Sequence, residues 1–552
     1  MLILAHFGLR AQTGAPVGTP PPGTPMPVGT PTPQWRPVYH FTPATNWTND
    51  PNGPIFFNGE YHLYNQQNPF ENKWGHMSWG HATSTDLVHW KHLAVAIPEK
   101  ISGSDTTWIF SGSAVWDRNN TSGFGGGLVA IYTADQPHVK KESQYIAYSN
   151  DGGMSYTNYA GNPVIDLQKK DFRDPNVFWH EPSKEWVMAV ALPSEHKVRF
   201  YGSANLKEWN LLSEFGPQGY VGANWECPSL IQLPVEGASG GAGASGSRAA
   251  SGAGKTKWVL MNSAAGGKRG VFMQYYIGDF DGKTFTNDNP AAETLTVDYG
   301  DCFYAAIPWN NLPDNEKVLI GWMIPGGQET FPWKGQMSIP RDLSVRKTAA
   351  GYRLVQQPTE LIKKELPADR MSEQTNVAVD GEVEIGKGHG LEGNSYWIDA
   401  ELELGPGTAG GAGGAGGGSA AAGGAAGGGA AGAMTAGFKI AQAKDASGAT
   451  TAETVIGYDL VKRQLFVDRS RSGQGKMKPG KVRQVIELPN AGNSIRLQVL
   501  FDKSSLEVFV NDGEKVLTTY IYPDEGATGC SAFATGGKAV IRTLRMWDLS
   551  KW

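Results

Sequence analysis

The chain has 552 residues, of which 40% are apolar and 11% aromatic, and this length exceeds one ordinary core and predicts two large domains. Its formal net charge of −5, without a basic stripe, argues against nucleic acid as a partner, and the lack of an 18-residue apolar run argues against a membrane span. Three cysteines (Cys227, Cys302 and Cys530) exclude a disulfide framework.

The first segments of the chain predict export. Residues 1–13 contain a short apolar run and a small-residue cut near Ala11 but no basic region before it, so we interpret them as a weak signal segment. Residues 14–34 are rich in Pro, Gly and Thr and repeat "PVGTP" twice, which is typical of an extended linker. We therefore expect a secreted or periplasmic protein.

Five similar segments follow between residues 35 and 355, and they begin at Asp50, Ser111, Asp174, Glu226 and Cys302. Each consists of a strand, a polar turn and a more apolar second strand, and most are followed by a third strand. Five such repeats predict a five-bladed β-propeller, in which four-stranded sheets surround a central channel. A pair of β-sandwiches is the structural alternative.

Two low-complexity stretches interrupt the predicted domains, at residues 237–254 and 405–433. Both consist almost entirely of Gly, Ala and Ser, which cannot bury enough apolar surface to offset the entropy of ordering them. We expect surface loops there. Residues 356–370 are predicted to connect the propeller to a second domain at 371–552. Longer alternating strands, such as "IRLQVLFDKSSLEVFVNDGEKVLTTYIYP", predict a β-sandwich there.

The repeats place three acids at matching positions. Asp50, Asp174 and Glu226 each begin a first strand, just before Pro or Cys-Pro. Because first strands line a propeller channel, the three carboxylates should converge at one mouth of it. Metal binding is one use of such a cluster, and sugar chemistry is another. A retaining glycosidase needs one ionised and one protonated carboxyl group, and crowding separates their pKa values.

Several motifs extend this prediction to a family. "NWTNDPNG", "FSGSAV", "FRDPNVFW", "WECPSL" and "MSWGHATSTDLVHW" resemble glycoside hydrolase family 32, the β-fructosidases. "LFVDRSRSG" and "SSLEVFVNDGE" resemble the C-terminal sandwich of that family. The resemblance covers residues 35 to 552 except for the two Gly/Ala inserts. It implies hydrolysis of fructans such as inulin or levan, and of sucrose, through a fructosyl-enzyme intermediate and without a cofactor.

The resemblance also implies roles for individual residues. Asp50 matches the nucleophile, Glu226 the acid/base, and Asp174 the stabiliser that binds fructosyl hydroxyls. The residues that match the terminal fructose pocket are Asn49, Gln66, Trp74, Phe110, Ser111 and Arg173, with Asp298 and Trp322 as further candidates. Thr48 replaces the Met that the family usually has in its first motif.

Three other functions stay open at this point. A fructosyltransferase would use the same residues, with a sugar hydroxyl in place of water. A five-bladed arabinan or xylan hydrolase also uses three acids, and a fructan-binding protein would lack catalysis. No metal site is predicted, because His76, His81 and His89 share no strand face and no acid joins them. The expected partner is a carbohydrate, and the sequence predicts no oligomeric state.

Overall fold

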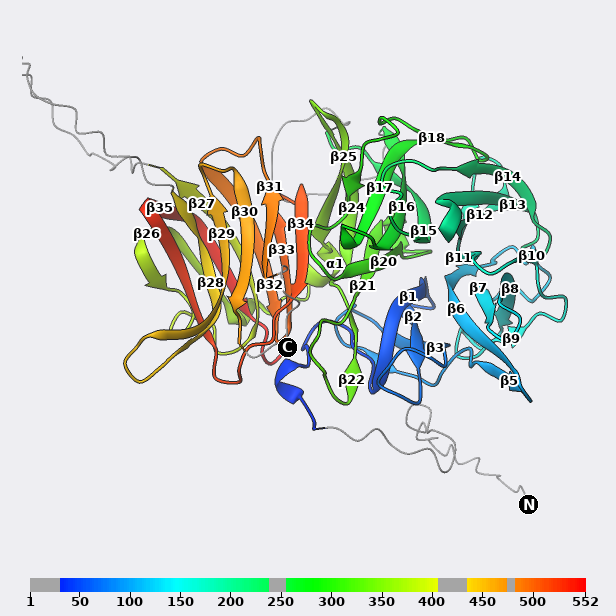
Figure 1. Cartoon of the computed structure of the whole chain (residues 1–552), viewed down its shortest axis with the longest axis horizontal. Coiled ribbons are helices and arrows are strands. Elements are labelled where there is room, and N and C mark those ends of the chain that lie inside the picture. Colours follow the sequence, from blue (N-terminus) through cyan, green and yellow to red (C-terminus); the bar gives the residue numbers. More distant parts are fainter. Residues whose placement is uncertain (1–29, 238–254, 406–433, 474–481) are drawn as a thin grey trace, which may run out of the picture.

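The structure is a computed structural model that describes residues 30–237, 255–405, 434–473 and 482–552. Within these ranges the chain is a five-bladed β-propeller followed by a β-sandwich, as predicted (Figure 1). The predicted signal segment, most of the linker and, apart from Gly237 and Gly405, both predicted inserts lie outside the described residues. The last residues of the linker region are described, and Thr32 hydrogen-bonds there with the carbonyl oxygen of Phe331.

Each blade is a separate sheet whose strands are hydrogen-bonded in order from the centre outwards. Blade one contains β1 (Asn46–Phe57), β2 (Glu60–Asn68), β3 (Ser78–Ser84) and β4 (Lys91–His92), with β22 (Trp333–Lys334) added beside β1. Blade two contains β6 (Asp105–Trp116), β7 (Leu128–Gln136), β8 (Lys141–Ser149) and β10 (Ile165–Lys169), with β5 (Lys100–Ser102) and β9 (Thr157–Asn158). Blade three contains β11 (Arg173–His180), β12 (Glu185–Leu192), β13 (Lys197–Ser203) and β14 (Asn210–Phe215).

The last two blades follow the same plan. Blade four contains β15 (Trp225–Pro234), β16 (Thr256–Gly266), β17 (Gly270–Phe280) and β18 (Phe285–Asn287), with β19 (Leu295–Thr296). Blade five contains β20 (Phe303–Pro308), β21 (Val318–Met323), β24 (Arg341–Thr348) and β25 (Gly351–Pro358), with β23 (Gln336–Met337). Short 3₁₀ helices lie at Pro33–Trp35, Pro193–Glu195, Pro313–Asn315 and Ala368–Arg370.

The first strands of the five blades form a closed ring. Strand β6 contacts β1 and β11, β15 contacts β11 and β20, and β20 returns to β1. The strands beside them are mostly buried, and every residue of β12 after Glu185 is buried. Turns set the register, as at Asn58–Gly59, where two residues of positive φ join β1 to β2 in the way that a tight hairpin requires. The first strands of the five segments found in the sequence are therefore the five inner strands.

The second domain is joined to the propeller by α1 (Glu360–Lys363) and is one sheet that closes around a core. Its strands are β26 (Met371–Glu384), β27 (Ser395–Leu404), β28 (Thr435–Lys444), β29 (Thr450–Asp459), β30 (Gln464–Arg471), β31 (Arg483–Glu487), β32 (Ser494–Asp502), β33 (Ser505–Val510), β34 (Lys515–Tyr520) and β35 (Gly529–Asp548). The long strand β35 pairs with β28 in its first half and with β27 in its second half, which links the two layers. Their facing residues form one core.

The two domains share a buried interface. Trp397, Leu500 and Phe509 of the sandwich join a hydrophobic cluster with Tyr39 and Trp322 of the propeller. The turn between β33 and β34 lies against β25, and a Cβ atom at Gly513 (φ +81°) would stand 1.8 Å from a backbone oxygen of the propeller. This close approach requires glycine. No helix of the described residues is long and apolar enough to cross a membrane.

Candidate active site

All five inner strands carry a β-bulge at the same level of the channel. In each strand two residues stand opposite one residue of the second strand: 49–50 opposite 66, 110–111 opposite 133, 174–175 opposite 190, 227–228 opposite 262, and 305–306 opposite 321. A bulge re-aims side chains and is common beside active sites. In three blades its first residue (Asp174, Cys227 and Ala305) has a positive φ. The bulges therefore direct side chains at this level of every inner strand toward the channel.

The bulges correct the sequence alignment of the three acids. Asp50 is the second residue of its bulge, Asp174 is the first residue of its own, and Glu226 precedes its bulge. The acids thus occupy three successive positions and not one equivalent position. Residues at the same level of adjacent blades contact each other. Because the three acids lie at successive levels relative to the bulges, each carboxylate has different neighbours.

The carboxylate of Asp50 accepts three hydrogen bonds from neutral donors. Ser111 Oγ lies 2.6 Å from Oδ2, Asn49 Nδ2 lies 3.1 Å from Oδ1, and Cys227 Sγ lies 3.6 Å from Oδ2. Burial and the nearby charge of Glu226 raise the pKa of Asp50, while the three donors oppose that rise. The carboxylate is therefore held in one orientation by groups that favour its ionised form.

Asp174 contacts the backbone of the next blade. Its Oδ2 accepts from the Cys227 amide at 2.9 Å and from the Cys227 thiol at 3.6 Å, and its own amide donates to Thr133 Oγ1 at 3.0 Å. Burial, with the charges of Glu226 and Asp50, raises the pKa of Asp174 to about 7, although Arg173 opposes the shift. Cys227 thus joins two of the three carboxylates.

Glu226 lies between a cation and a phenol. Its Oε1 accepts from Arg173 at 2.9 Å and 3.2 Å, and its Oε2 accepts from the hydroxyl of Tyr304 at 2.6 Å. Burial and the charge of Glu226 raise the pKa of Tyr304 well above its usual range, so the phenol stays a donor. The Arg173 guanidinium also binds Glu142 at 2.9 Å and 3.1 Å. Its charge is therefore balanced without Glu226.

The structure places the other predicted residues around this level of the channel. Asn49 is fixed by Trp47, whose indole donates to its amide oxygen at 2.8 Å, and Gln66 donates to the backbone of β6 at 2.8 Å. Trp74 is half exposed and contacts Phe110, with ring centroids 6.1 Å apart. Trp322 lies edge-on to Trp47 and to Tyr304 at 5.9 Å and 6.5 Å. Together these rings form an aromatic rim beside the acids.

Thr48 and Asp298 do not belong to this rim. Thr48 is fully buried, and its hydroxyl donates to the Gln66 carbonyl at 3.1 Å and accepts from Asn65 at 2.8 Å. Asp298 was predicted to bind substrate, and the structure places it instead at the domain interface. Its carboxylate accepts from Arg341 at 3.0 Å and from the Thr518 hydroxyl at 2.6 Å, and the residue is 2% exposed. A sugar hydroxyl has no access to it.

Sequence reasoning missed three residues that contact the predicted site: Tyr304, Glu142 and Trp108, whose ring stacks on Phe110 at 6.4 Å. Tyr304 could have been found by aligning the fifth repeat two residues later, which places it at the level of Glu226. Glu142 lies on the third strand of its blade, where the repeat pattern gives no signal. Within the described residues, no group of three or more His, Cys, Asp or Glu side chains is arranged to hold a metal ion.

Three carboxylates at one mouth of a five-bladed propeller, flanked by aromatic rings, form the site of a glycoside hydrolase. Comparison with known proteins agrees. The model of the glycosyl hydrolases family 32 N-terminal domain matches residues 40–358, and that of the glycosyl hydrolases family 32 C terminal matches residues 365–548. The chain belongs to glycoside hydrolase family 32, and the predicted β-fructosidase class of enzyme is confirmed.

Curated relatives and solved structures cover nearly the whole chain. A levanase of Bacillus subtilis is 39% identical over 522 residues, which span 92% of this chain and 69% of that protein. The extracellular exo-inulinase of Aspergillus niger is 37% identical over 531 residues, with 89% and 90% covered. The crystal structure of exo-inulinase from Aspergillus awamori superposes with a TM-score of 0.77 at 33% identity, and covers 93% of this chain and 98% of its own.

Proposed function

We propose that this enzyme removes terminal fructose from β-2,1 and β-2,6 fructans and from sucrose by a retaining mechanism. Support for exo action comes from the relatives of Aspergillus niger and Aspergillus awamori, which are exo-inulinases. Support for both linkages comes from the similarity to a levanase as well as to inulinases. Fructan or sucrose is accordingly the partner of the site.

In the first step Asp50 attacks the anomeric C2 of the terminal fructosyl group while Glu226 protonates the leaving oxygen. Asp50 suits the nucleophile because its three neutral donors favour the ionised form and fix its direction. Glu226 is held by Arg173 and Tyr304, and Arg173 retains Glu142 as an ion-pair partner when Glu226 gives or takes the proton. In the second step Glu226 accepts a proton from water, which attacks C2 and releases fructose.

Asp174 is assigned to the hydroxyl groups of the fructosyl ring. Its second carboxylate oxygen, Oδ1, makes no hydrogen bond within the described residues, while Oδ2 is fixed by Cys227. A carboxylate fixed on one side can bind ring hydroxyls with the other and stabilise the oxocarbenium-like transition state. Trp74, Phe110 and Trp322 provide apolar surface for the sugar ring.

The single observation that carries these roles is that separate sets of neighbours fix Asp50 and Glu226 at one level of the channel. Asp50 receives only uncharged donors, whereas Glu226 receives a guanidinium and a phenol. Trapping tests it. A Glu226→Ala variant treated with β-fructosyl fluoride should accumulate an adduct, because fluoride leaves without a proton and no base then activates water. Mass spectrometry should find one fructosyl group on the peptide that contains Asp50.

Two controls complete the experiment. The enzyme with Glu226 intact should show no adduct under the same conditions, and azide should release the adduct of the variant as fructosyl azide. An adduct on Asp174 would overturn the assignment of the nucleophile. Products resolved by size test exo action, since free fructose alone supports it and a ladder of oligomers contradicts it. Longer fructans formed in concentrated sucrose would instead indicate a transferase.

Secretion is also part of this proposal. Relatives from two Aspergillus species are described as extracellular. Fractionation of producing cells, followed by N-terminal sequencing of the protein, tests it. A mature protein outside the cytoplasm that begins after residues 1–13 would support export, and a cytoplasmic protein that retains Met1 would contradict it.

A further inference from the structure

A pocket lies at the end of the propeller channel opposite to the three acids. It has a volume of about 670 Å³ and is lined by four of the five blades near the ends of their inner strands. Trp116 ends β6 and His180 ends β11, whereas Asp174 lies at the start of β11. His180 lies six residue steps along the strand from Asp174, roughly 20 Å at 3.3 Å per step. This volume is within the range of small-molecule sites, about 300 to 1,000 Å³.

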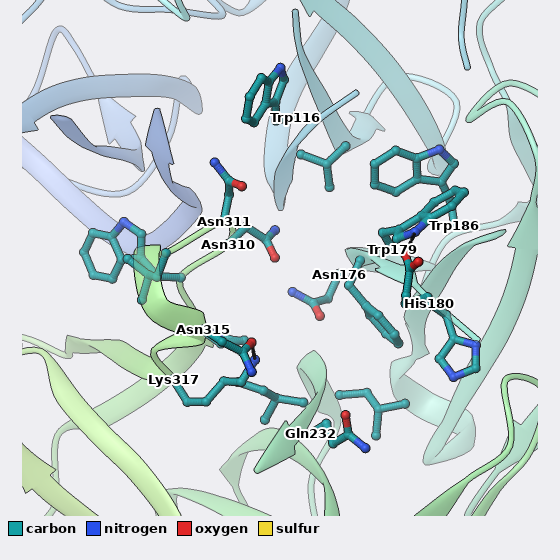
Figure 2. A pocket seen from close by; sticks show the side chains of 18 of the residues that line it. Trp116, Asn176, Trp179, His180, Trp186, Gln232, Asn310, Asn311, Asn315 and Lys317 are labelled. Atoms are coloured by element: carbon teal, nitrogen blue, oxygen red, sulfur yellow. Dashed lines mark hydrogen bonds between the residues drawn. The ribbon is translucent and has the colours of Figure 1, made fainter. Parts of the chain in front are cut away.

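Tryptophan rings form much of the pocket wall (Figure 2). Trp179 and Trp186 meet edge to face, with centroids 5.1 Å apart. Their indole nitrogens donate to Glu181 at 2.6 Å and to Thr121 at 2.9 Å. Trp116 donates to a backbone carbonyl at 3.1 Å. Because these ring nitrogens are engaged by the protein, the ring positions are fixed, and a ligand would meet preformed apolar surfaces.

Polar groups with unused hydrogen-bonding capacity face the same space. Asn176 is 6% exposed, and Figure 2 shows its amide projecting into the pocket. Within the described ranges that amide makes no hydrogen bond. Gln232 uses only its nitrogen, which donates to Thr256 at 3.0 Å, so its oxygen is available. Lys317 donates to Asn315 at 2.7 Å and forms no ion pair with a carboxylate of the described residues. Of these three residues Asn176 is buried, Lys317 is half-buried and Gln232 is exposed. Buried polar groups ordinarily have partners, so the amide of Asn176 points to a ligand that Gln232 and Lys317 could also contact.

The chemistry of the lining favours an uncharged polar ligand. The cations Arg118 and Lys317 are matched in number by the acids Glu181 and Glu316, so the wall has no excess of positive charge for a phosphate. Amide groups that both donate and accept, beside fixed indole faces, suit molecules that carry many hydroxyl groups on an apolar ring. Sugars have this combination.

We propose that this pocket is a second carbohydrate-binding site, which takes a short uncharged oligosaccharide at the channel end remote from the three acids. Such a site would hold part of a polymeric substrate, or its product, without cleaving it. It does not depend on the roles assigned to Asp50 and Glu226.

Calorimetric titration with 1-kestose tests the proposal, using the full chain with a Glu226→Gln substitution that prevents consumption of the sugar. Two binding sites per chain are expected. Adding Trp179→Ala should weaken one of them roughly tenfold, since an aromatic contact surface is lost. Gln232→Ala, a milder change at an exposed position, should weaken the same site. Trp209→Ala, on the same blade but outside the pocket, should leave both sites unchanged.

The titration can support or overturn the proposal. Two sites, of which one is weakened by Trp179→Ala and Gln232→Ala but not by Trp209→Ala, support the proposal. A single site in the Glu226→Gln parent, or two sites that neither pocket variant affects, overturns it. With Glu226 intact, the Trp179→Ala enzyme should release fructose from sucrose at the unaltered rate. If the unsubstituted enzyme released no fructose, this result would count against the proposed function and not against the second site.

Discussion

Tyr304 donates its hydroxyl hydrogen to Glu226 over 2.6 Å, from the inner strand of blade five to that of blade four. The two residues precede equivalent bulges, so the contact follows from the symmetry of the propeller. Arg173 occupies the same level in blade three and reaches Glu226 from the other side. The proposed acid/base is thus positioned by its neighbours at the same level of the ring.

Removing this hydroxyl should impair catalysis more than stability. Tyr304→Phe keeps the ring in place but removes the hydrogen bond that orients the carboxyl group of Glu226 toward the leaving oxygen. We expect kcat on sucrose to fall roughly tenfold to a hundredfold, part of the contribution of a positioned general acid. KM should change little. Tyr61→Phe is the matched control, since Tyr61 is a buried tyrosine of blade one whose hydroxyl lies outside this network. Equal losses in both variants would contradict a specific role for Tyr304.

Cys227 should be chemically inert despite its place between two catalytic candidates. Burial and the charges of Asp174 and Asp50 raise the pKa of the thiol well above its usual range, so little thiolate forms at neutral pH. Cys302 and Cys530 are buried as well. We expect iodoacetamide at pH 7 to leave activity unchanged and to label no cysteine of the folded enzyme. Unfolding in denaturant should expose all three to labelling. Stoichiometric inactivation of the folded enzyme would contradict this prediction.

The sequence was sufficient for the propeller because each blade repeats a strand, a polar turn and a more apolar strand. It was also sufficient to bring the three acids together, since Asp50, Asp174 and Glu226 all lie in the first half of an inner strand. It could not predict that they lie at successive positions, because a bulge is a property of strand pairing. Only the register between two strands shows which residue is extra.

Contacts between distant segments limited the rest of the prediction. Asp298 precedes the fifth blade, and its partner Thr518 lies 220 residues further along the chain. No local pattern indicates such a pair. Thr48 shows the same limit at short range, because its hydroxyl bonds to Gln66 and Asn65 of β2, and only the hairpin register reveals that it is buried.

Asp298→Asn tests whether this residue is structural. Asp298 is buried, and its carboxylate pairs with Arg341 and accepts from both the amide and the hydroxyl of Thr518. Loss of one partner from a buried ion pair costs about 3 kcal/mol. We therefore expect a lower midpoint of thermal unfolding with an unchanged KM for sucrose. A raised KM at unchanged stability would instead restore Asp298 to the substrate site, as the sequence predicted.

His40 links the domains through two carboxylates of the sandwich. Its Nδ1 lies 2.9 Å from Asp502 and its Nε2 lies 3.0 Å from Glu507. Burial lowers the pKa of His40, but the hydrogen bonds and charges of Asp502 and Glu507 outweigh burial and raise that pKa to about 9. Asp502 also accepts from the backbone amides of residues 38–40. The start of the propeller is therefore fixed to the sandwich by a charged imidazole.

This arrangement should make stability depend on pH. The folded pKa of His40, about 9, exceeds the ordinary value of 6.5, so its stabilisation is complete below pH 6.5 and is lost as the pH rises through 9. The loss amounts to roughly 3 kcal/mol in the free energy of unfolding. Midpoints of thermal unfolding measured between pH 6 and pH 9.5 should therefore fall with pH. His40→Gln should be less stable at pH 6 and show a flatter profile, whereas His89→Gln, at an exposed imidazole, should keep the slope of the parent. An identical slope in His40→Gln would show that another group causes the pH dependence.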